Sequence, residues 1–305
     1  MKQSITIGTR GSRLALIQTE LVAGRIKQQN HHLEVNITEI TTQGDRDRQT
    51  RLDRLAGEGV FVKELEESLI DGSIDLAVHS LKDMPTRVPS GLALSAVLER
   101  ANPGDVLVSR GGKLSGLPAG ARIGTGSLRR AVQLIALRPD LKVDSIRGNV
   151  DTRVQKVFSG EFDGVILAAA AMIRMGWHDK VSEYLSLEDF LPAVGQGAMV
   201  VETRSDDEDT VALVSMINHL PTWHSVTAER AFLDALGGGC RAPIAALGTV
   251  TGDTLKLEGM VAEPGGKKRL RLVEEGKAAD AEAVGRQLAQ RMLSLGAAEF
   301  ISEVT

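Results

Sequence analysis

The stretch Ile7–Gln18 reads IGTRGSRLALIQ, and a close counterpart, IGTGSLRRAVQL, occupies Ile123–Leu134. In both, an apolar segment ends in Ile-Gly-Thr, a short Gly/Ser turn and a basic residue follow, and a helical pattern begins. The repetition predicts two similarly built α/β lobes that face each other. Open α/β sheets bind ligands beyond the carboxyl ends of their strands, so both turns are expected to lie at a binding site.

Around the first copy, apolar segments alternate with helical patterns, which is typical of parallel βαβ units and of the α/β class. Strands are expected at residues 4–8, 33–40 and 74–80, and helices at 12–29 and 61–73. In the first helix, Leu14, Ile17 and Leu21 are expected to share one apolar, buried face. The polar, charge-dense stretch 43–59 is interpreted either as a solvated loop or as a mobile lid.

The segment ANPGD at residues 101–105 interrupts this series, and a second α/β series follows it. The stretch 191–205, LPAVGQGAMVVETRS, predicts a glycine-rich crossover and a strand that returns to the first lobe. From residue 220 onward, a helix, three strands joined by turns and a closing amphipathic helix predict a small α+β unit. The predicted domains are therefore 1–100 plus 197–219, 101–196 and 220–305.

The composition is that of an ordinary globular protein, with 42% apolar and 25% charged residues. No stretch is long and uncharged enough to span a bilayer, and the N-terminal MKQSITIGTR lacks the apolar segment of a signal peptide. The formal net charge of -4 and the 3% aromatic content argue against binding to nucleic acid or to acidic membranes. We therefore expect a cytoplasmic protein and, since neither a coiled-coil seam nor a large apolar interface is evident, a monomer.

Motifs for nucleotide and metal chemistry are missing from the sequence. It contains no G-x-G-x-x-G, P-loop, H-E-x-x-H or paired C-x-x-C motif, and its six histidines lack the spacing of metal ligands. A metal or nucleotide enzyme is therefore disfavoured, and no metal is expected.

Arginine supplies 24 of the 36 basic residues, and six arginines fall at predicted strand-to-helix junctions. A cation in the first turn of a helix opposes the macrodipole, whereas an anion there is stabilised. Any one of these arginines is typical of a surface salt bridge, but six together predict a site for a ligand with several carboxylates or phosphates. The six are Arg10, Arg129, Arg130, Arg147, Arg153 and Arg174.

Asp83 lies in VHSLKDMP, residues 78–85, just after a strand that should be buried. Beside Lys82, its carboxylate is suited to acid/base chemistry or to stabilising a developing cation. An ordinary turn aspartate before Pro85 explains the position equally well. The sequence around Asp83 leaves both interpretations open.

Cys240 is the only cysteine, in LGGGCRAPIA at residues 236–245, so no disulfide can form within the chain. An isolated cysteine is commonly a buried apolar residue. Here, three glycines leave space around the sulfur, and Arg241 favours the thiolate. The two interpretations are a buried structural residue and a reactive thiol.

Seven motifs occur in an order that resembles the porphobilinogen deaminase family, also called hydroxymethylbilane synthases. They are TRGSRLALIQ, FVKELE, DLAVHSLKDMPT, GTGSLRRAVQL, IRGNVDTR, LPAVGQGA and GGCRAPIA, and they cover nearly the whole chain. The resemblance implies two periplasmic-binding-protein-like α/β domains around a cleft. It also implies a small α+β C-terminal domain that carries the cysteine.

By this resemblance the protein would be a transferase (EC 2.5.1.61) of tetrapyrrole and haem biosynthesis. It would join four porphobilinogen molecules head to tail with loss of ammonia, and hydrolysis would release hydroxymethylbilane. The chain would grow on a dipyrromethane cofactor, assembled from substrate and held by a thioether to Cys240. Every pyrrole carries an acetate and a propionate, which would explain the excess of arginine.

The resemblance also assigns roles to individual residues. Asp83 would be the catalytic residue, contacting pyrrole N–H groups and stabilising the azafulvene cation formed as ammonia leaves. The cofactor would be bound by Cys240, Lys82, Asp83, Ser80, Thr125, Ser127, Arg129, Arg130 and Arg153. The substrate would be bound by Arg10, Ser12, Gln18, Phe61, Arg147, Arg153, Arg174 and Gln196.

Two positions depart from the family pattern. Glu58 stands before the FVKELE helix where a lysine is common, which puts a cationic contribution from the lid in doubt. Ala171 stands where a glycine is common, which would alter the packing behind Arg174 without removing its guanidinium group.

Two other functions fit part of the sequence. A non-catalytic anion-binding protein would explain the arginines and the paired lobes, but neither Asp83 nor the thiol on its loop. A hydrolase or acyltransferase with a cysteine nucleophile would need a base near Cys240, and His224 is the nearest histidine in the sequence.

Overall fold

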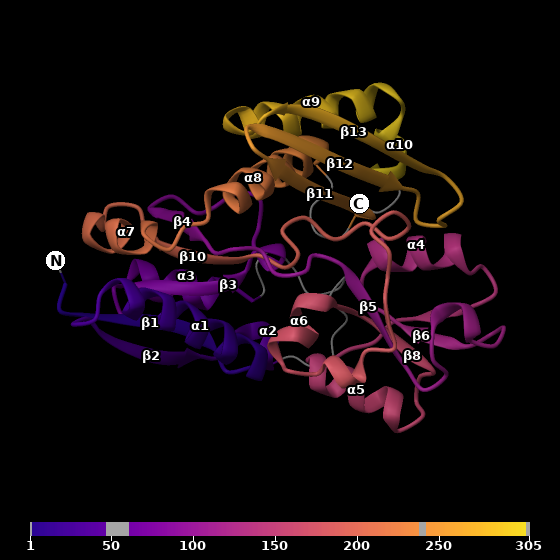
Figure 1. The fold of residues 1–305 in the computed structure, drawn as a ribbon, viewed down its shortest axis with the longest axis horizontal. Helices are drawn as coiled ribbons and strands as arrows, with labels where there is room; N and C mark the ends of the chain where they lie inside the picture. The colour runs from indigo at the N-terminus through magenta and orange to yellow at the C-terminus, as the bar shows by residue number, and fades with distance from the viewer. Residues whose placement is uncertain (1, 47–60, 238–241, 303–305) are drawn as a thin grey trace.

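The computed structural model describes residues 2–46, 61–237 and 242–302. These residues form two five-stranded sheets and one three-stranded sheet, which lie in three regions of the molecule (Figure 1). Helices pack on each sheet. The predicted α/β class with a smaller α+β unit at the C-terminal end is confirmed by this arrangement, whereas the exact domain boundaries stay a prediction.

The first sheet has the strand order β2-β1-β3-β10-β4. Its strands are β1 (Ser4–Arg10), β2 (Glu34–Ile40), β3 (Leu76–Ser80), β4 (Leu92–Val97) and β10 (Met199–Arg204). Strand β1 runs parallel to β2 and β3, whereas β10 runs antiparallel to β3 and β4. The strand expected to return from the second lobe is therefore confirmed as β10.

The second sheet has the order β7-β6-β8-β5-β9. Its strands are β5 (Asp105–Ser109), β6 (Arg122–Gly124), β7 (Lys142–Asp144), β8 (Gly164–Ala168) and β9 (Glu183–Tyr184). Strand β6 is parallel to β7 and β8, but β5 is antiparallel to β8 and β9. The predicted parallel units are confirmed in both sheets, by β1 with β2 and β3 and by β6 with β7 and β8. Each sheet also contains a strand of opposite direction, β10 in the first and β5 in the second.

The helix predicted at 12–29 is found at 13–29, and the one predicted at 61–73 is found at 63–70. The short helix at 43–46 was not predicted, because it lies in the stretch interpreted as a loop or a lid. The first unit contains α1 (Arg13–Gln29), α2 (Gln43–Arg46), α3 (Lys63–Ile70), α7 (Glu208–Ser215) and the short 3-10 helix η1 (Leu81–Asp83). The second contains α4 (Leu128–Leu137), α5 (Val150–Phe158), α6 (Ala169–Arg174) and the 3-10 helices η2 (Leu114–Gly116) and η3 (His178–Lys180). Ser12 caps α1 and Ser127 caps α4, so the two similar turns have the same local structure.

The predicted buried face of α1 is wrong. Leu21 is 46% exposed, and Leu14 and Ile17 are only half-buried. The helix instead buries the side that carries Val22 and Ile26, which pack on the core of the first sheet. Helix α1 also contacts α6 of the second unit.

The third unit is an antiparallel sheet, β11-β12-β13, covered by helices (Figure 1). Its elements are α8 (Leu220–Leu236), β11 (Ile244–Thr251), β12 (Thr254–Ala262), β13 (Arg269–Lys277), the 3-10 helix η5 (Ala278–Asp280), α9 (Ala281–Ser294) and α10 (Ala297–Ser302). Phe232 on α8 and Leu288 on α9 are fully buried in its core. No helix in the described ranges is long and apolar enough to cross a membrane.

Two connecting segments, residues 98–104 and 191–198, join the first sheet to the second and lie side by side. The backbone N–H of Ala101 donates to the carbonyl of Gly197 over 3.2 Å. The Glu229 carboxylate on α8 binds both segments, since it accepts from Nη1 of Arg100 (2.5 Å) and from the N–H of Gly195 (2.7 Å). The third unit is therefore attached where the first two are joined.

Candidate active site

The turn after β3 presents Lys82 and Asp83 beside the connecting segments. Ser80, the last residue of β3, exchanges hydrogen bonds with the amide of Gln18 on α1, with Nε2 donating over 3.0 Å. Lys82 is half-buried and its Nζ donates to Oε1 of Gln196 over 3.4 Å. The Asp83 side chain is exposed. This turn therefore holds one ammonium group inward and one carboxylate outward.

Arg129 and Arg130, in the first turn of α4, are buried and bind one carboxylate, that of Asp105 at the start of β5. Nη1 of Arg129 lies 2.8 Å from Oδ2, and Nη2 of Arg130 lies 2.6 Å from Oδ1. Burial alone would raise the pKa of Asp105, but the two guanidinium groups outweigh it and lower the pKa to about 2. Asp105 is therefore ionised across the physiological range.

Asp105 is not among the site residues predicted from the sequence. A usable signal exists: an aspartate after Pro-Gly begins a strand whose next residues, Val106 and Leu107, are apolar and fully buried. A charge at that position requires a buried partner of opposite sign. The two arginines opposing the dipole of α4 are thus held by a protein carboxylate.

Gln196, fully buried in the second connecting segment, lies between these groups. Its Nε2 donates to the carbonyl of Pro103 (2.7 Å) and to Oδ1 of Asp105 (3.0 Å). Its Oε1 accepts from Lys82 and from Nη2 of Arg130, each over 3.4 Å. One amide therefore links the turn after β3, the start of α4 and both connecting segments.

The site carries more positive charge than its carboxylates balance. Burial and then the charge of Arg130 lower the pKa of Lys82 to about 8, against the effects of Asp83 and Asp105. Burial, Arg130 and Arg147 lower the pKa of Arg153 to about 10, again against Asp83. One positive charge lowers the pKa of another only when the two lie close together. Lys82, Arg153 and the arginines that lower their pKa values therefore form one cluster.

The remaining predicted residues lie around this cluster. Buried Thr125 accepts from the N–H of Ser127 over 3.1 Å. Nε of Arg153 donates to the carbonyl of Gly148 (2.8 Å), and Nη2 of Arg174 donates to that of Gly197 (2.7 Å). Burial lowers the pKa of Arg174 to about 10.

At the end of β1, the guanidinium carbon of Arg10 lies 4.1 Å from the ring centre of Phe61, a cation–π contact. Ser12 follows as the cap of α1, where it accepts from the N–H of Ala15 over 3.3 Å. Phe61 is half-buried, and Ala171 is buried in α6. Of the two positions that depart from the family pattern, the structure describes Ala171 and does not describe Glu58.

Three sequence predictions lie outside the described residues. Cys240, Glu58 and nearly all of the stretch 43–59 fall in the ranges 47–60 and 238–241. His224 is half-buried on α8. The geometry between His224 and Cys240 therefore stays untested.

Sequence comparison supplies the family. The model of the porphobilinogen deaminase dipyromethane cofactor binding domain matches residues 5–212, and that of the deaminase C-terminal domain matches residues 223–294. The chain belongs to the porphobilinogen deaminase family. The porphobilinogen deaminase of Geobacter metallireducens is 46% identical over 99% of this chain and 95% of its own length, and that of Pelotomaculum thermopropionicum is 46% identical over 99% and 97%.

Membership in the deaminase family confirms the predicted activity. The protein is a porphobilinogen deaminase-type transferase (EC 2.5.1.61) of tetrapyrrole biosynthesis, with a domain for the dipyrromethane cofactor and porphobilinogen as substrate. The two alternatives, a non-catalytic anion-binding protein and a cysteine-nucleophile hydrolase, are therefore set aside.

Partial structural likeness extends to periplasmic proteins. The Bordetella pertussis BvgS periplasmic VFT2 domain is 16% identical, with 70% of this chain and 86% of that chain covered and a TM-score of 0.41. The probable amino-acid ABC transporter extracellular-binding protein ytmK from Bacillus subtilis is 13% identical, with 71% and 90% covered and a TM-score of 0.43. The family assignment rests on the sequence matches and not on these structures.

The described residues fit a cofactor that carries several carboxylates. The cluster has excess positive charge, and Nε of Arg129 is buried without a hydrogen-bond partner among the described residues. A buried donor left without an acceptor is unfavourable, and an anionic ligand supplies acceptors and negative charge together. The donor set therefore suits the acetate and propionate groups of a dipyrromethane.

Proposed function

We propose that the cluster after β3 and at the start of α4 holds the carboxylates of the dipyrromethane cofactor. The residues assigned to it are Ser80, Lys82, Asp83, Thr125, Ser127, Arg129, Arg130 and Arg153. The observation that supports this assignment best is the lowered pKa of Lys82, about 8. The positive charge of Arg130 repels the ammonium group of Lys82. A bound carboxylate offsets this repulsion, so part of the free energy of cofactor binding comes from that relief.

Cys240 is proposed as the covalent anchor, through a thioether. When bound, the cofactor supplies the free pyrrole carbon to which the first substrate is joined. Anchoring by one sulfur places the two carboxylate-bearing rings at high effective concentration beside the cluster. Arginines and Lys82 then need only orient the rings.

Asp83 is proposed as the catalytic carboxylate. At each addition, the aminomethyl C–N bond of porphobilinogen breaks, ammonia leaves, and a new C–C bond forms while the attacked pyrrole carbon loses a proton. Positive charge develops on the substrate pyrrole as ammonia departs, and an ionised carboxylate at its N–H stabilises that charge. Asp83 is the exposed carboxylate of the cluster, and it stands outside the ion pair that Asp105 forms with Arg129 and Arg130.

Four such additions consume four porphobilinogen molecules, and one water releases hydroxymethylbilane with four ammonia molecules lost. The residues proposed to bind the substrate are Arg10, Ser12, Gln18, Phe61, Arg147, Arg153, Arg174 and Gln196. Because the lengthening product adds two carboxylates per unit, separate arginines would bind successive units.

We further propose a cytoplasmic monomer with domains 1–100 plus 197–219, 101–196 and 220–305, and with a cleft between the first two. The three sheets support this division, since no strand of one sheet lies within the range assigned to another. The oligomeric state is measurable by light scattering of the purified protein.

The test uses two variants and intact-mass measurement. Wild-type protein is expected to carry a mass increment of two linked porphobilinogen-derived units, which peptide mapping places on Cys240. Cys240→Ser is expected to lack the increment, whereas Asp83→Ala keeps it and loses turnover. An unmodified wild-type protein that also fails to load when incubated with porphobilinogen would overturn the anchor assignment, and an active Asp83→Ala would overturn the catalytic one.

A further inference from the structure

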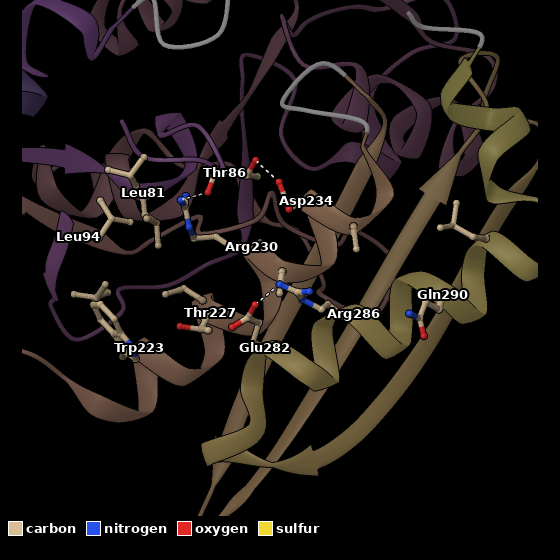
Figure 2. Close-up of a pocket in the computed structure, with 16 residues that line it drawn as sticks. Leu81, Thr86, Leu94, Trp223, Thr227, Arg230, Asp234, Glu282, Arg286 and Gln290 are labelled. Carbon is tan, nitrogen blue, oxygen red and sulfur yellow. Dashed lines mark hydrogen bonds and ion pairs between the residues drawn. The ribbon is translucent and has the colours of Figure 1, made fainter. Parts of the chain in front are cut away.

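A cavity of about 690 Å³ lies outside the proposed active site, between the first unit and the third. The turn after β3 and strand β4 form one side of it, and helices α8 and α9 form the other (Figure 2). Binding sites for small molecules have volumes of roughly 300–1,000 Å³, so this cavity is of ligand size.

The side formed by the first unit is mainly apolar, since four of its five residues are aliphatic and only Thr86 is polar. Leu81 and Val97 are buried, and Leu94 is half-buried. From α8, the half-buried Trp223 and the buried Val226 extend the same surface, and all five pack in one hydrophobic cluster. The partly exposed Leu94 and the indole of Trp223 offer an apolar and aromatic surface to a bound molecule.

The charged side chains that line the cavity are already paired. Two are cationic and two anionic, so the lining has no net formal charge. Nη2 of Arg230 donates to the carbonyls of Pro85 (2.8 Å) and Thr86 (2.9 Å), and Arg286 pairs with Glu282 (Figure 2). A charged ligand would have to break such a pair or bury an unmatched charge, both of which are unfavourable.

Asp234, the fourth charged residue of the lining, is also engaged. Its Oδ1 accepts from the hydroxyl of Thr86 over 3.0 Å and from Nε of Arg87 over 3.4 Å. Together with the Arg230 bonds, these contacts tie residues 85–87 to α8. The cavity is therefore bounded by the chain that continues directly from Lys82 and Asp83.

We propose that this cavity is a second ligand site, which binds an uncharged aromatic molecule. Through Leu81 and residues 85–87, the bound molecule alters turnover at the active site. The lining of this cavity has no net formal charge and favours an uncharged ligand. The proposed active site instead has an excess of cations and favours a ligand with several carboxylates. A molecule in the cavity contacts both Leu81, the residue before Lys82, and helices of the third unit. It restrains the turn relative to α8, so it is expected to slow turnover.

The first experiment measures binding of N-phenyl-1-naphthylamine, an uncharged aromatic probe whose fluorescence rises in apolar surroundings. Saturable binding is expected, with an affinity at least about tenfold higher than for 1-anilinonaphthalene-8-sulfonate, its sulfonated relative. Porphobilinogen is expected not to displace the probe. Displacement, or equal affinity for the two probes, would overturn the proposal.

A matched pair of variants locates the bound probe. Ala235 is exposed on α8 and lines the cavity, so Ala235→Trp is expected to fill its mouth and weaken binding by about tenfold. Leu220→Trp adds the same ring to the exposed start of the same helix, away from the lining, and is expected to leave binding unchanged. Unchanged binding by Ala235→Trp would place the probe elsewhere and overturn the site.

The coupling is tested on porphobilinogen turnover. N-phenyl-1-naphthylamine at a concentration that saturates the wild-type holoenzyme is expected to lower its kcat by about twofold or more. In Ala235→Trp the probe concentration that gives half of this effect is expected to rise by about tenfold. Probe binding with an unchanged kcat would overturn the coupling. A wild-type holoenzyme that does not turn over porphobilinogen even without the probe would instead count against the proposed active site. Failure of the second ligand site and failure of the active-site proposal can therefore be told apart.

Discussion

Nη2 of Arg130 lies 2.6 Å from Oδ1 of Asp105, and both side chains are buried. Arg129 binds the other oxygen of the same carboxylate. Asp105 thus neutralises one of two adjacent guanidinium charges and leaves the other for a ligand. The cluster is positioned by a protein anion and still has capacity for the carboxylates of a cofactor.

Asp105→Asn should destabilise the protein while keeping its shape. The amide cannot balance two buried guanidinium groups, and breaking a buried ion pair by removing one partner costs about 3 kcal/mol or more. Urea unfolding measures this loss. Asp144→Asn removes an exposed carboxylate that pairs with Arg122 over 2.8 Å and should change the free energy of unfolding by about 0.5 kcal/mol or less. Equal effects of the two substitutions would show that Asp105 has no special role.

The sequence predicted where helices and strands lie more reliably than which of their side chains are buried and what those side chains contact. The two Ile-Gly-Thr turns, their serine caps and the returning strand β10 follow from local patterns, because capping and apolar runs depend on neighbouring residues. The buried face of α1 did not follow, since Gln18 and Thr19 are buried and Leu21 is not. A polar residue is buried when a distant partner satisfies it, as Ser80 does for Gln18.

The candidate site shows the same division. Five of the six arginines could be found from their positions at strand-to-helix junctions, and the family resemblance gave all six their roles. The prediction is wrong for Arg174, which is the last residue of α6. Their attachment to Asp105 and Gln196 could not be found, because these contacts join residues 25 and 66 positions apart from Arg130. Nor does sequence spacing reveal the cavity beside Trp223, which exists only where two units meet.

Lys82→Arg should remove an alkaline limit on cofactor loading. Burial, and then the charge of Arg130, lower the pKa of Lys82 from its ordinary value to about 8. The ammonium group that attracts the incoming carboxylates is therefore lost as the pH rises through that value, whereas an arginine stays charged. Loading of cofactor-free protein with porphobilinogen, followed by intact mass from about pH 7 to about pH 9.5, should decline in wild type and much less in the variant.

The control for this prediction is Lys63→Arg, an exposed substitution on α3. It should follow the wild-type profile, which accounts for titration of porphobilinogen itself. Parallel profiles for wild type, Lys82→Arg and Lys63→Arg would refute the assignment of the alkaline limit to Lys82.

Glu66→Gln should stabilise the protein at neutral pH. Burial, and then the charge of Glu202, raise the pKa of Glu66, and its Oε1 is buried without a partner among the described residues. A carboxyl with a raised folded-state pKa favours folding at low pH, and that advantage is lost as the pH rises through the folded pKa. The gain on substitution should therefore be present near pH 7 and shrink toward pH 4.5, the ordinary value.

Thermal unfolding across this range measures the effect. Glu67→Gln, one residue further along α3 in an exposed 3.9 Å pair with Lys63, is the matched control and should change stability little at any pH. A gain for Glu66→Gln that is constant from low to neutral pH would mean that ionisation of Glu66 is not its source.

Gly197→Ala should disturb the junction of the connecting segments far more than an equivalent substitution elsewhere. Gly197 has φ of +89°, and a Cβ there would lie 2.6 Å from the carbonyl oxygen of Ala101. Gly176 has φ of +69° with nothing within 4 Å of its Cβ position, so Gly176→Ala carries only the backbone strain, about 1 kcal/mol. Gly197→Ala adds a backbone clash and is expected to lower the free energy of unfolding by about 3 kcal/mol or more.

Gly197→Ala should also lower turnover, because Gln196 next to it links Lys82 to Asp105. Thermal unfolding and porphobilinogen turnover test both parts, and equal behaviour of the two alanine variants would mean that the close approach of the segments is not needed to hold the site.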